Sequence, residues 1–171
     1  MKNKLKTLIK NYLSAIFTFF LAGLLAAFSA LVFSILVFDF LNILKEPKTI
    51  ILGGVFIEEV FRFLFLYLSI SLTISNLKKF LWTLFLMNGL GFIFLEIFLI
   101  LQSYSNLSLE DVIINYLPAA FVHLFNSLLL GYAILFSKNI HFKKIVFLIF
   151  LIISVIIHLV FNVFANSLKL C

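Results

Sequence analysis

Charged, imidazole and amide side chains interrupt segments of this sequence that are otherwise apolar, and their types and spacing suggest chemistry. One such segment contains Glu58, Glu59 and Arg62 within the stretch Phe-Ile-Glu-Glu-Val-Phe-Arg. Ionisable residues in apolar spans are energetically costly and usually have a function. The three apolar segments that follow contain a second group of polar residues: Asn88, Glu96, His123, Asn126, Ser127, His158 and Asn162.

These residue types fit the hydrolysis of a peptide bond by activated water. A desolvated glutamate beside histidines can take a proton from water, and His and Asn donors can stabilise the oxyanion that then develops. On a helix, Glu58 and Arg62 are i,i+4 neighbours and Glu59 and Arg62 are i,i+3 neighbours, so Arg62 can neutralise one carboxylate. Adjacent glutamates point about 100° apart. We therefore predict that one faces the bundle centre while the other faces Arg62 or another helix.

Each of these residues also has a structural interpretation. The glutamates and Arg62 could form an ion pair that locks two helices together, and either histidine could make an interhelical hydrogen bond. Asn126 and Ser127 fit packing or hydrogen bonding, and Glu96 fits a substrate-facing residue or a support for one. The functional interpretation gains from helical spacing, because His158 and Asn162 share one face, as do His123 and Ser127.

The composition predicts an integral membrane protein. The chain is 64% hydrophobic and 12% charged, whereas soluble domains are about 45–50% apolar and about 25% charged. A net charge of +6 would suit a nucleic-acid-binding protein. The lysines, however, occur in short clusters between apolar stretches, which is typical of cytoplasmic loops. We therefore predict no nucleic-acid partner.

Five segments are long enough to cross a bilayer, which needs about 20 apolar residues. We predict an all-α fold, a polytopic transmembrane helix bundle that forms a single integral membrane domain over residues 1–171. A hairpin in the long first segment would give six spans instead of five. With five spans and a cytoplasmic N-terminus in the cell membrane, most lysines lie inside. The predicted spans are 12–36 (or as far as 44), 50–74, 80–102, 112–136 and 143–166.

The polar residues of four consecutive spans fall at a similar depth. Counted from the predicted outer ends, Glu58, Glu59, Glu96, His123 and His158 lie roughly 9–17 Å below the outer surface, at about 1.5 Å per residue. Antiparallel spans would therefore place these side chains in one layer, where they can form one site.

Four motifs, taken in order, resemble those of a known superfamily. They are Glu-Glu-x-x-Arg at 58–62, Gly-x-Gly-Phe-x-x-x-Glu at 89–96, His-x-x-x-Ser-x-x-x-Gly at 123–131 and His-x-x-x-Asn at 158–162. This order resembles the glutamate-dependent intramembrane endopeptidases, which include the CAAX prenyl proteases and the bacteriocin-processing (CPBP, or Abi) proteins. The PrsW-type proteases are the most similar branch, although Arg62 stands where they usually have Lys. The resemblance covers about Ile51 to Phe164.

The resemblance implies roles for individual residues. Glu58 and Glu59 would be the catalytic carboxylate pair, and His123, His158 and Asn162 would complete the site. Glu96 would be a further member, and we add Arg62 and Ser127 as supporting residues. The expected activity is an intramembrane endopeptidase, whose partners are the lipid bilayer and a membrane-anchored or membrane-adjacent peptide substrate.

Other functions remain open at this point. A non-catalytic membrane scaffold or a bacteriocin-immunity-type protein of the same superfamily would keep the polar residues for helix packing. A transporter could use the glutamates as proton carriers, but the chain has no inverted repeat. We predict no cofactor, because there is no His-Glu-x-x-His motif. A divalent metal held by Glu59, His123 and His158 is the alternative, since these are zinc-ligand types.

Overall fold

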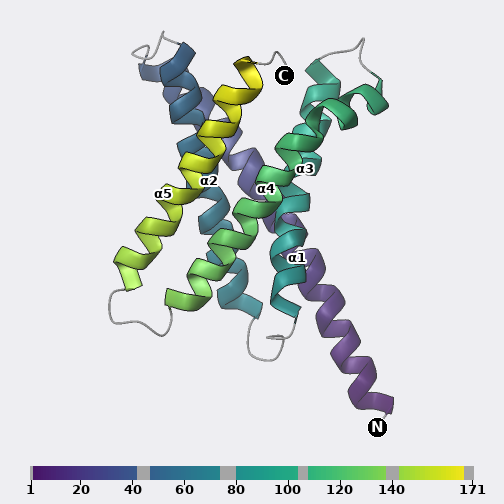
Figure 1. Ribbon diagram of the computed structural model, residues 1–171. Coiled ribbons are helices and arrows are strands. Elements are labelled where there is room, and N and C mark those ends of the chain that lie inside the picture. Colours follow the sequence, from purple (N-terminus) through teal and green to yellow (C-terminus); the bar gives the residue numbers. More distant parts are fainter. Residues whose placement is uncertain (1, 42–46, 74–79, 104–107, 138–142, 168–171) are drawn as a thin grey trace.

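A computed structural model describes residues 2–41, 47–73, 80–103, 108–137 and 143–167. The described residues form a bundle of five α-helices, which confirms the predicted all-α fold (Figure 1). Several lysines on which the predicted orientation rests lie outside the described residues, namely Lys45, Lys78, Lys79, Lys138 and Lys169. The helices are α1 (Lys2–Leu41), α2 (Pro47–Thr73), α3 (Leu81–Ser103), α4 (Leu109–Ser137) and α5 (Lys143–Ser167).

The first helix differs from both forms of the prediction. α1 is continuous over 40 residues, so the hairpin that would have given six spans is wrong. Its apolar part, Ile9–Phe38, is longer than the predicted 12–36. At about 1.5 Å per residue α1 is about 60 Å long, about twice the thickness of a bilayer core. Its N-terminal part accordingly extends beyond the other helices (Figure 1).

The fourth helix begins earlier than predicted, because a capping interaction lies in the predicted connection 103–111. The Asp111 backbone N–H donates to Ser108 Oγ at 3.1 Å, and the Ser108 backbone N–H donates to Asp111 Oδ2 at 3.3 Å. This reciprocal pairing satisfies amide groups that a helix start leaves without partners. α4 therefore begins at Leu109 rather than at 112.

Close helix contacts hold the bundle together. α1 packs against α2 and α3, α4 packs against α3 and α5, and α2 also contacts α4 and α5. Where α1 crosses α3, a Cβ added to Gly23 would overlap the Asn88 carbonyl, and one added to Gly91 would overlap the Phe20 carbonyl. Glycine at both positions therefore lets the two backbones touch. This crossing places α3 beside the polar residues of α2.

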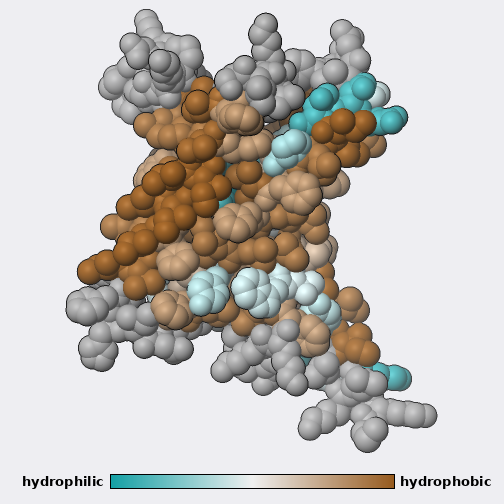
Figure 2. All heavy atoms as spheres, in the orientation of Figure 1, coloured by the Kyte–Doolittle hydropathy of each residue, from teal (hydrophilic) through white to brown (hydrophobic). Residues whose placement is uncertain are grey.

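The outer surface is apolar on every helix. Large side chains such as Phe17, Leu72, Trp82, Phe121 and Val160 are exposed, and hydrophobic residues fill the middle of the face in Figure 2. Exposed apolar surface on this scale is found where a protein contacts a membrane. Among the described residues, four helices are long and apolar enough to cross a bilayer: α1, α3, α4 and α5.

The second helix has 27 residues but carries three charged side chains in its middle. Glu59 and Arg62 are fully buried, while the exposed face of α2 carries apolar residues such as Phe56 and Leu64. Glu59 and Arg62 therefore point into the bundle, toward α4 and α5, rather than toward its surroundings.

Candidate functional site

Glu59 is the centre of a buried polar cluster. Its Oε1 pairs with Arg62 Nη1 and accepts hydrogen bonds from Asn126 Nδ2 at 3.0 Å and from His158 Nδ1 at 2.8 Å. Its Oε2 accepts from Ser154 Oγ at 2.7 Å. The side chain is fully buried, and donors from α2, α4 and α5 occupy both oxygens. Glu59 is therefore a fixed, compensated anion and has little capacity to bind water.

Arg62 contacts the Glu59 carboxylate and also the side chains of Phe92 and His123. Besides pairing with Glu59, its guanidinium carbon lies 4.0 Å from the centre of the Phe92 ring, a cation–π contact. Its Nη2 lies 2.6 Å from His123 Nδ1. A guanidinium has five donors and no acceptor. The predicted neutralisation of one carboxylate by Arg62 is confirmed, and that carboxylate belongs to Glu59.

The contact with Arg62 determines the tautomer of His123. Because Arg62 can only donate, His123 Nδ1 must accept, and the ring proton must lie on Nε2. His123 Nε2 is 2.9 Å from Glu96 Oε2, so it donates to that carboxylate. The Tyr116 hydroxyl donates to the same oxygen. Two side chains of α4 thus hold the carboxylate of Glu96 on α3.

His158 lies between the two adjacent glutamates. Its Nδ1 donates to Glu59, and its Nε2 is 3.7 Å from Glu58 Oε2, an ion-pair distance that is too long for a hydrogen bond. The His158 and His123 rings meet edge to face, with centroids 4.8 Å apart. His158 therefore lies between the two carboxylates, hydrogen-bonded to Glu59 and facing Glu58.

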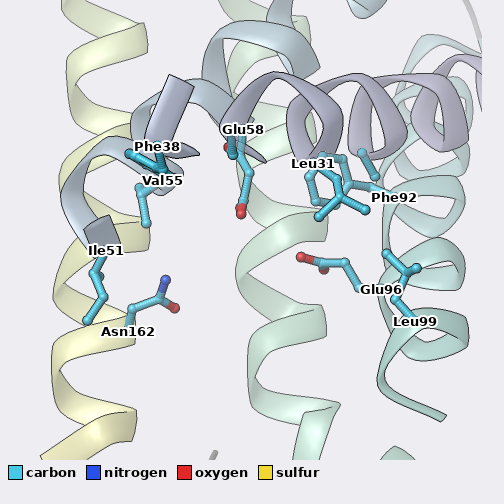
Figure 3. Close-up of a pocket in the computed structure, with 12 residues that line it drawn as sticks. Leu31, Phe38, Ile51, Val55, Glu58, Phe92, Glu96, Leu99 and Asn162 are labelled. Atoms are coloured by element: carbon cyan, nitrogen blue, oxygen red, sulfur yellow. The ribbon is translucent and has the colours of Figure 1, made fainter. Parts of the chain in front are cut away.

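A cavity of about 310 Å³ adjoins the cluster, and three of the predicted site residues line it. Figure 3 shows the carboxylates of Glu58 and Glu96 and the amide of Asn162 pointing into this space from α2, α3 and α5. The Glu58 side chain is 29% exposed and that of Glu96 is 24% exposed, whereas Glu59 is 0% exposed. The two neighbouring glutamates thus point in different directions, as the 100° helical rotation predicts, but the glutamate at the bundle centre is also the one that pairs with Arg62.

The structure brings together most of the residues that the sequence indicated. The polar groups of α2, α3, α4 and α5 meet in one layer, as their similar depths predict. Ser127 lies elsewhere: its hydroxyl is 3.5 Å from Asn88 Oδ1, and it lies beside Gly89 on α3. We therefore assign Ser127 to the packing of α3 against α4 rather than to the Glu59 cluster.

Some members of the cluster were not predicted. Ser154 and Tyr116 are absent from the predicted site, whereas the hydrogen-bonding role predicted for Asn126 is confirmed by its bond to Glu59. Helical spacing places each of these residues on the same face as a histidine. Ser154 precedes His158 by four residues. Tyr116 lies seven residues before His123, and Asn126 lies three residues after it. A search for polar residues on the same helical face as each histidine would have found all three.

The cluster is almost completely satisfied. Among the described residues, two of its buried polar atoms have no hydrogen-bond partner, Arg62 Nε and Asn126 Oδ1. Buried polar networks stabilise a unique arrangement only when nearly every group is paired. The groups that line the cavity therefore project from a rigid support.

The geometry does not favour the metal site considered as an alternative. Within the described ranges, no group of three or more His, Cys, Asp or Glu side chains is arranged to hold a metal ion. Glu59 is already occupied by Arg62, Asn126 and Ser154, and His123 Nδ1 is occupied by Arg62. A metal shared by Glu59, His123 and His158 would therefore have to displace contacts that these side chains already make within the protein.

Comparison of the chain with protein-family models, with curated proteins and with solved structures gives no match. The resemblance to glutamate-dependent intramembrane endopeptidases therefore rests on the four sequence motifs.

Proposed function

We propose that this protein is an intramembrane endopeptidase in which Glu58 activates the attacking water. The observation that carries the proposal is the contrast between the two adjacent glutamates. Glu59 is buried and bound by four donor groups, whereas the Glu58 carboxylate faces a cavity beside Glu96 and Asn162. A base must be able to reach water and substrate, and of the two adjacent glutamates only Glu58 adjoins such a space.

The proposed reaction needs no covalent enzyme intermediate. Glu58 takes a proton from water, and the water oxygen forms a bond with the carbonyl carbon of the scissile peptide. The oxyanion that develops is stabilised by the N–H of the Asn162 amide, and by His158 Nε2–H with the ring in its imidazolium form, in which both nitrogens donate; the two residues lie on the same side of α5. When the C–N bond breaks, the proton passes from Glu58 to the leaving nitrogen, which regenerates the carboxylate.

The supporting residues keep this arrangement fixed. Glu59 holds His158, and Arg62 links Glu59 to His123, which in turn holds Glu96. Preorganised donors of this kind are the main source of electrostatic catalysis. The proposed substrate is a membrane-anchored or membrane-adjacent peptide, which reaches the site laterally or from the outer face. The lysine distribution supports a cytoplasmic N-terminus in the cell membrane.

The test is cleavage of a panel of single-span reporter proteins produced together with this chain. We expect Glu58→Gln to lower product formation by at least about 100-fold, because general-base catalysis contributes about 10²–10⁴. Glu110→Gln is the matched control: it makes the same chemical change at an exposed position near the start of α4. His158→Ala and Asn162→Ala should also lose activity at equal expression.

The alternative to catalysis is a membrane scaffold, for which the buried cluster provides a specific observation. Glu59 and Arg62 connect three helices and would do so without any reaction. A scaffold would tolerate Glu58→Gln and Asn162→Ala but not the loss of Glu59. Full biological function of the Glu58→Gln variant would therefore exclude the protease and leave the scaffold.

A further inference from the structure

We propose that the cavity beside Glu58 is a subsite for one large apolar side chain of the substrate, and that Gly54 sets its size. This inference rests on the proposed function, because it describes what that site would accept. It assigns the site a preference for a substrate side chain, and this preference does not follow from the four motifs, because Gly54 lies outside all of them.

The lining of the cavity combines polar and apolar side chains. Its polar residues are Ser34, Glu58, Glu96 and Asn162. The remaining lining is apolar, comes from α1, α2 and α3, and flanks the polar side chains of Glu58, Glu96 and Asn162 (Figure 3). A peptide needs the same combination, because its backbone needs hydrogen-bonding partners while an apolar side chain needs an apolar wall. The labelled apolar residues of this wall are Leu31, Phe38, Ile51, Val55, Phe92 and Leu99.

Gly54 lies where an adjacent substrate side chain must go. It precedes Glu58 by four residues, so both lie on the same face of α2. A Cβ built on Gly54 has no neighbouring heavy atom within 4 Å, which means that it would project into open space. The next glycine is different, because a Cβ on Gly53 would be 3.1 Å from the Phe38 ring of α1. Gly53 accommodates a helix contact, whereas Gly54 leaves part of the cavity empty.

The size of the cavity favours a side chain over a lipid tail. Its volume of about 310 Å³ lies at the lower end of the range of about 300–1,000 Å³ for ligand pockets. That space holds one large side chain with its flanking backbone. A long acyl chain would need a longer apolar channel, and it would offer no hydrogen-bonding partner to the Glu58 carboxylate or the Asn162 amide.

The experiment measures occupancy of the cavity without relying on turnover. In a Cys171→Ser background, which removes the chain's own cysteine, Gly54→Cys places a thiol in the cavity. The rate of its alkylation by N-ethylmaleimide is measured on the full chain in lipid nanodiscs. The competitors are capped tripeptide aldehydes that end in leucine, alanine or aspartate, since their hydrates mimic a tetrahedral intermediate. Leu52→Cys, on the exposed face of the same helix, is the matched control.

We expect the leucine peptide to protect Cys at position 54 and to leave Cys at position 52 unaffected. The alanine peptide should need at least about tenfold higher concentration for the same protection, because one methylene in an apolar pocket is worth about 10–200-fold. The aspartate peptide should not protect, because its carboxylate would face Glu58 and Glu96. Gly54→Leu and Ser34→Leu, which fill the cavity from α2 and α1, should abolish binding of the leucine peptide as measured by its effect on Tm.

Three results would overturn the inference. Equal protection by leucine and aspartate peptides would show that the cavity does not select apolar side chains. Protection by oleate but not by the leucine peptide would make the occupant a lipid chain. Unchanged peptide binding in both cavity-filling variants would place the subsite elsewhere. Failure of the proposed function has a different signature: either the parent chain cleaves none of the reporters, or Glu58→Gln cleaves them as well as the parent chain does.

Discussion

Replacement of Glu59 by glutamine should damage the stability of the protein far more than the same replacement of Glu58. Glu59→Gln keeps the volume but removes the charge that compensates Arg62, which is fully buried. Removing one partner of a buried ion pair costs about 3–5 kcal/mol, because the other charge stays buried without compensation. The bonds from His158 and Ser154 also weaken, although coupled losses of this kind are not additive.

Glu58 provides the comparison. Its side chain is 29% exposed, and its contact with His158 is 3.7 Å long. An exposed ion pair contributes about 0–1 kcal/mol. We therefore expect Glu59→Gln to lower the unfolding free energy by about 3–5 kcal/mol and Glu58→Gln to lower it by less than about 1 kcal/mol. Unfolding by dodecyl sulfate in mixed micelles, followed by circular dichroism, measures both values.

A double variant tests whether charge is the cause. Glu59→Gln combined with Arg62→Met removes both charges and keeps an unbranched side chain of similar length at position 62. Neutral replacements of buried ion pairs are often close to neutral in stability. The double variant should therefore be more stable than Glu59→Gln alone. Equal unfolding of the two single glutamine variants, or a double variant weaker than Glu59→Gln, would refute the reasoning.

Three further predictions concern the support of the site. Gly91→Ala should destabilise the fold by about 1–3 kcal/mol, since its Cβ would overlap the Phe20 carbonyl; Gly54→Ala, with open space around its Cβ, is the control that should unfold like the parent chain. Tyr116→Phe removes the hydroxyl that donates to the carboxylate of α3. It should slow reporter cleavage by roughly tenfold, since a hydrogen bond to a charged group contributes about 1.5–3 kcal/mol; unchanged cleavage would show that the hydroxyl does not position that carboxylate. Arg62→Lys should lower both stability and cleavage, because one ammonium replaces a guanidinium that contacts two partners through separate nitrogens; a variant with parental Tm and cleavage would contradict this.

The sequence predicted those features that depend on a single helix. The pairing of Glu59 with Arg62 follows from i,i+3 spacing, and the different directions of the Glu58 and Glu59 side chains follow from their 100° separation. The common layer of polar residues also followed, because the rise per residue of a helix converts position into depth. Each of these features needed only the geometry of an α-helix and the limits of the spans.

Features that depend on how helices rotate against one another could not be predicted. Which glutamate faces the cavity depends on the orientation of α2 relative to α1, α4 and α5, and the sequence left Glu58 and Glu59 as equal candidates. The separation of Ser127 from the cluster has the same origin, since the orientation of α4 directs Asn126, about 100° from Ser127, toward Glu59. The extent of α1 was missed for another reason: its lysine-rich start continues the helix although it is not apolar.

The side chains of the two adjacent glutamates are related through His158, which contacts both carboxylates. A carboxylate in an apolar cavity would be free to turn away from water unless a neighbour held it. Here Glu59 is held by Arg62, Asn126 and Ser154, and it fixes the imidazole of His158 through Nδ1. The opposite nitrogen of that rigid ring then faces Glu58. In the proposed reaction, the contribution of the buried ion pair is to fix the imidazole that faces the Glu58 carboxylate.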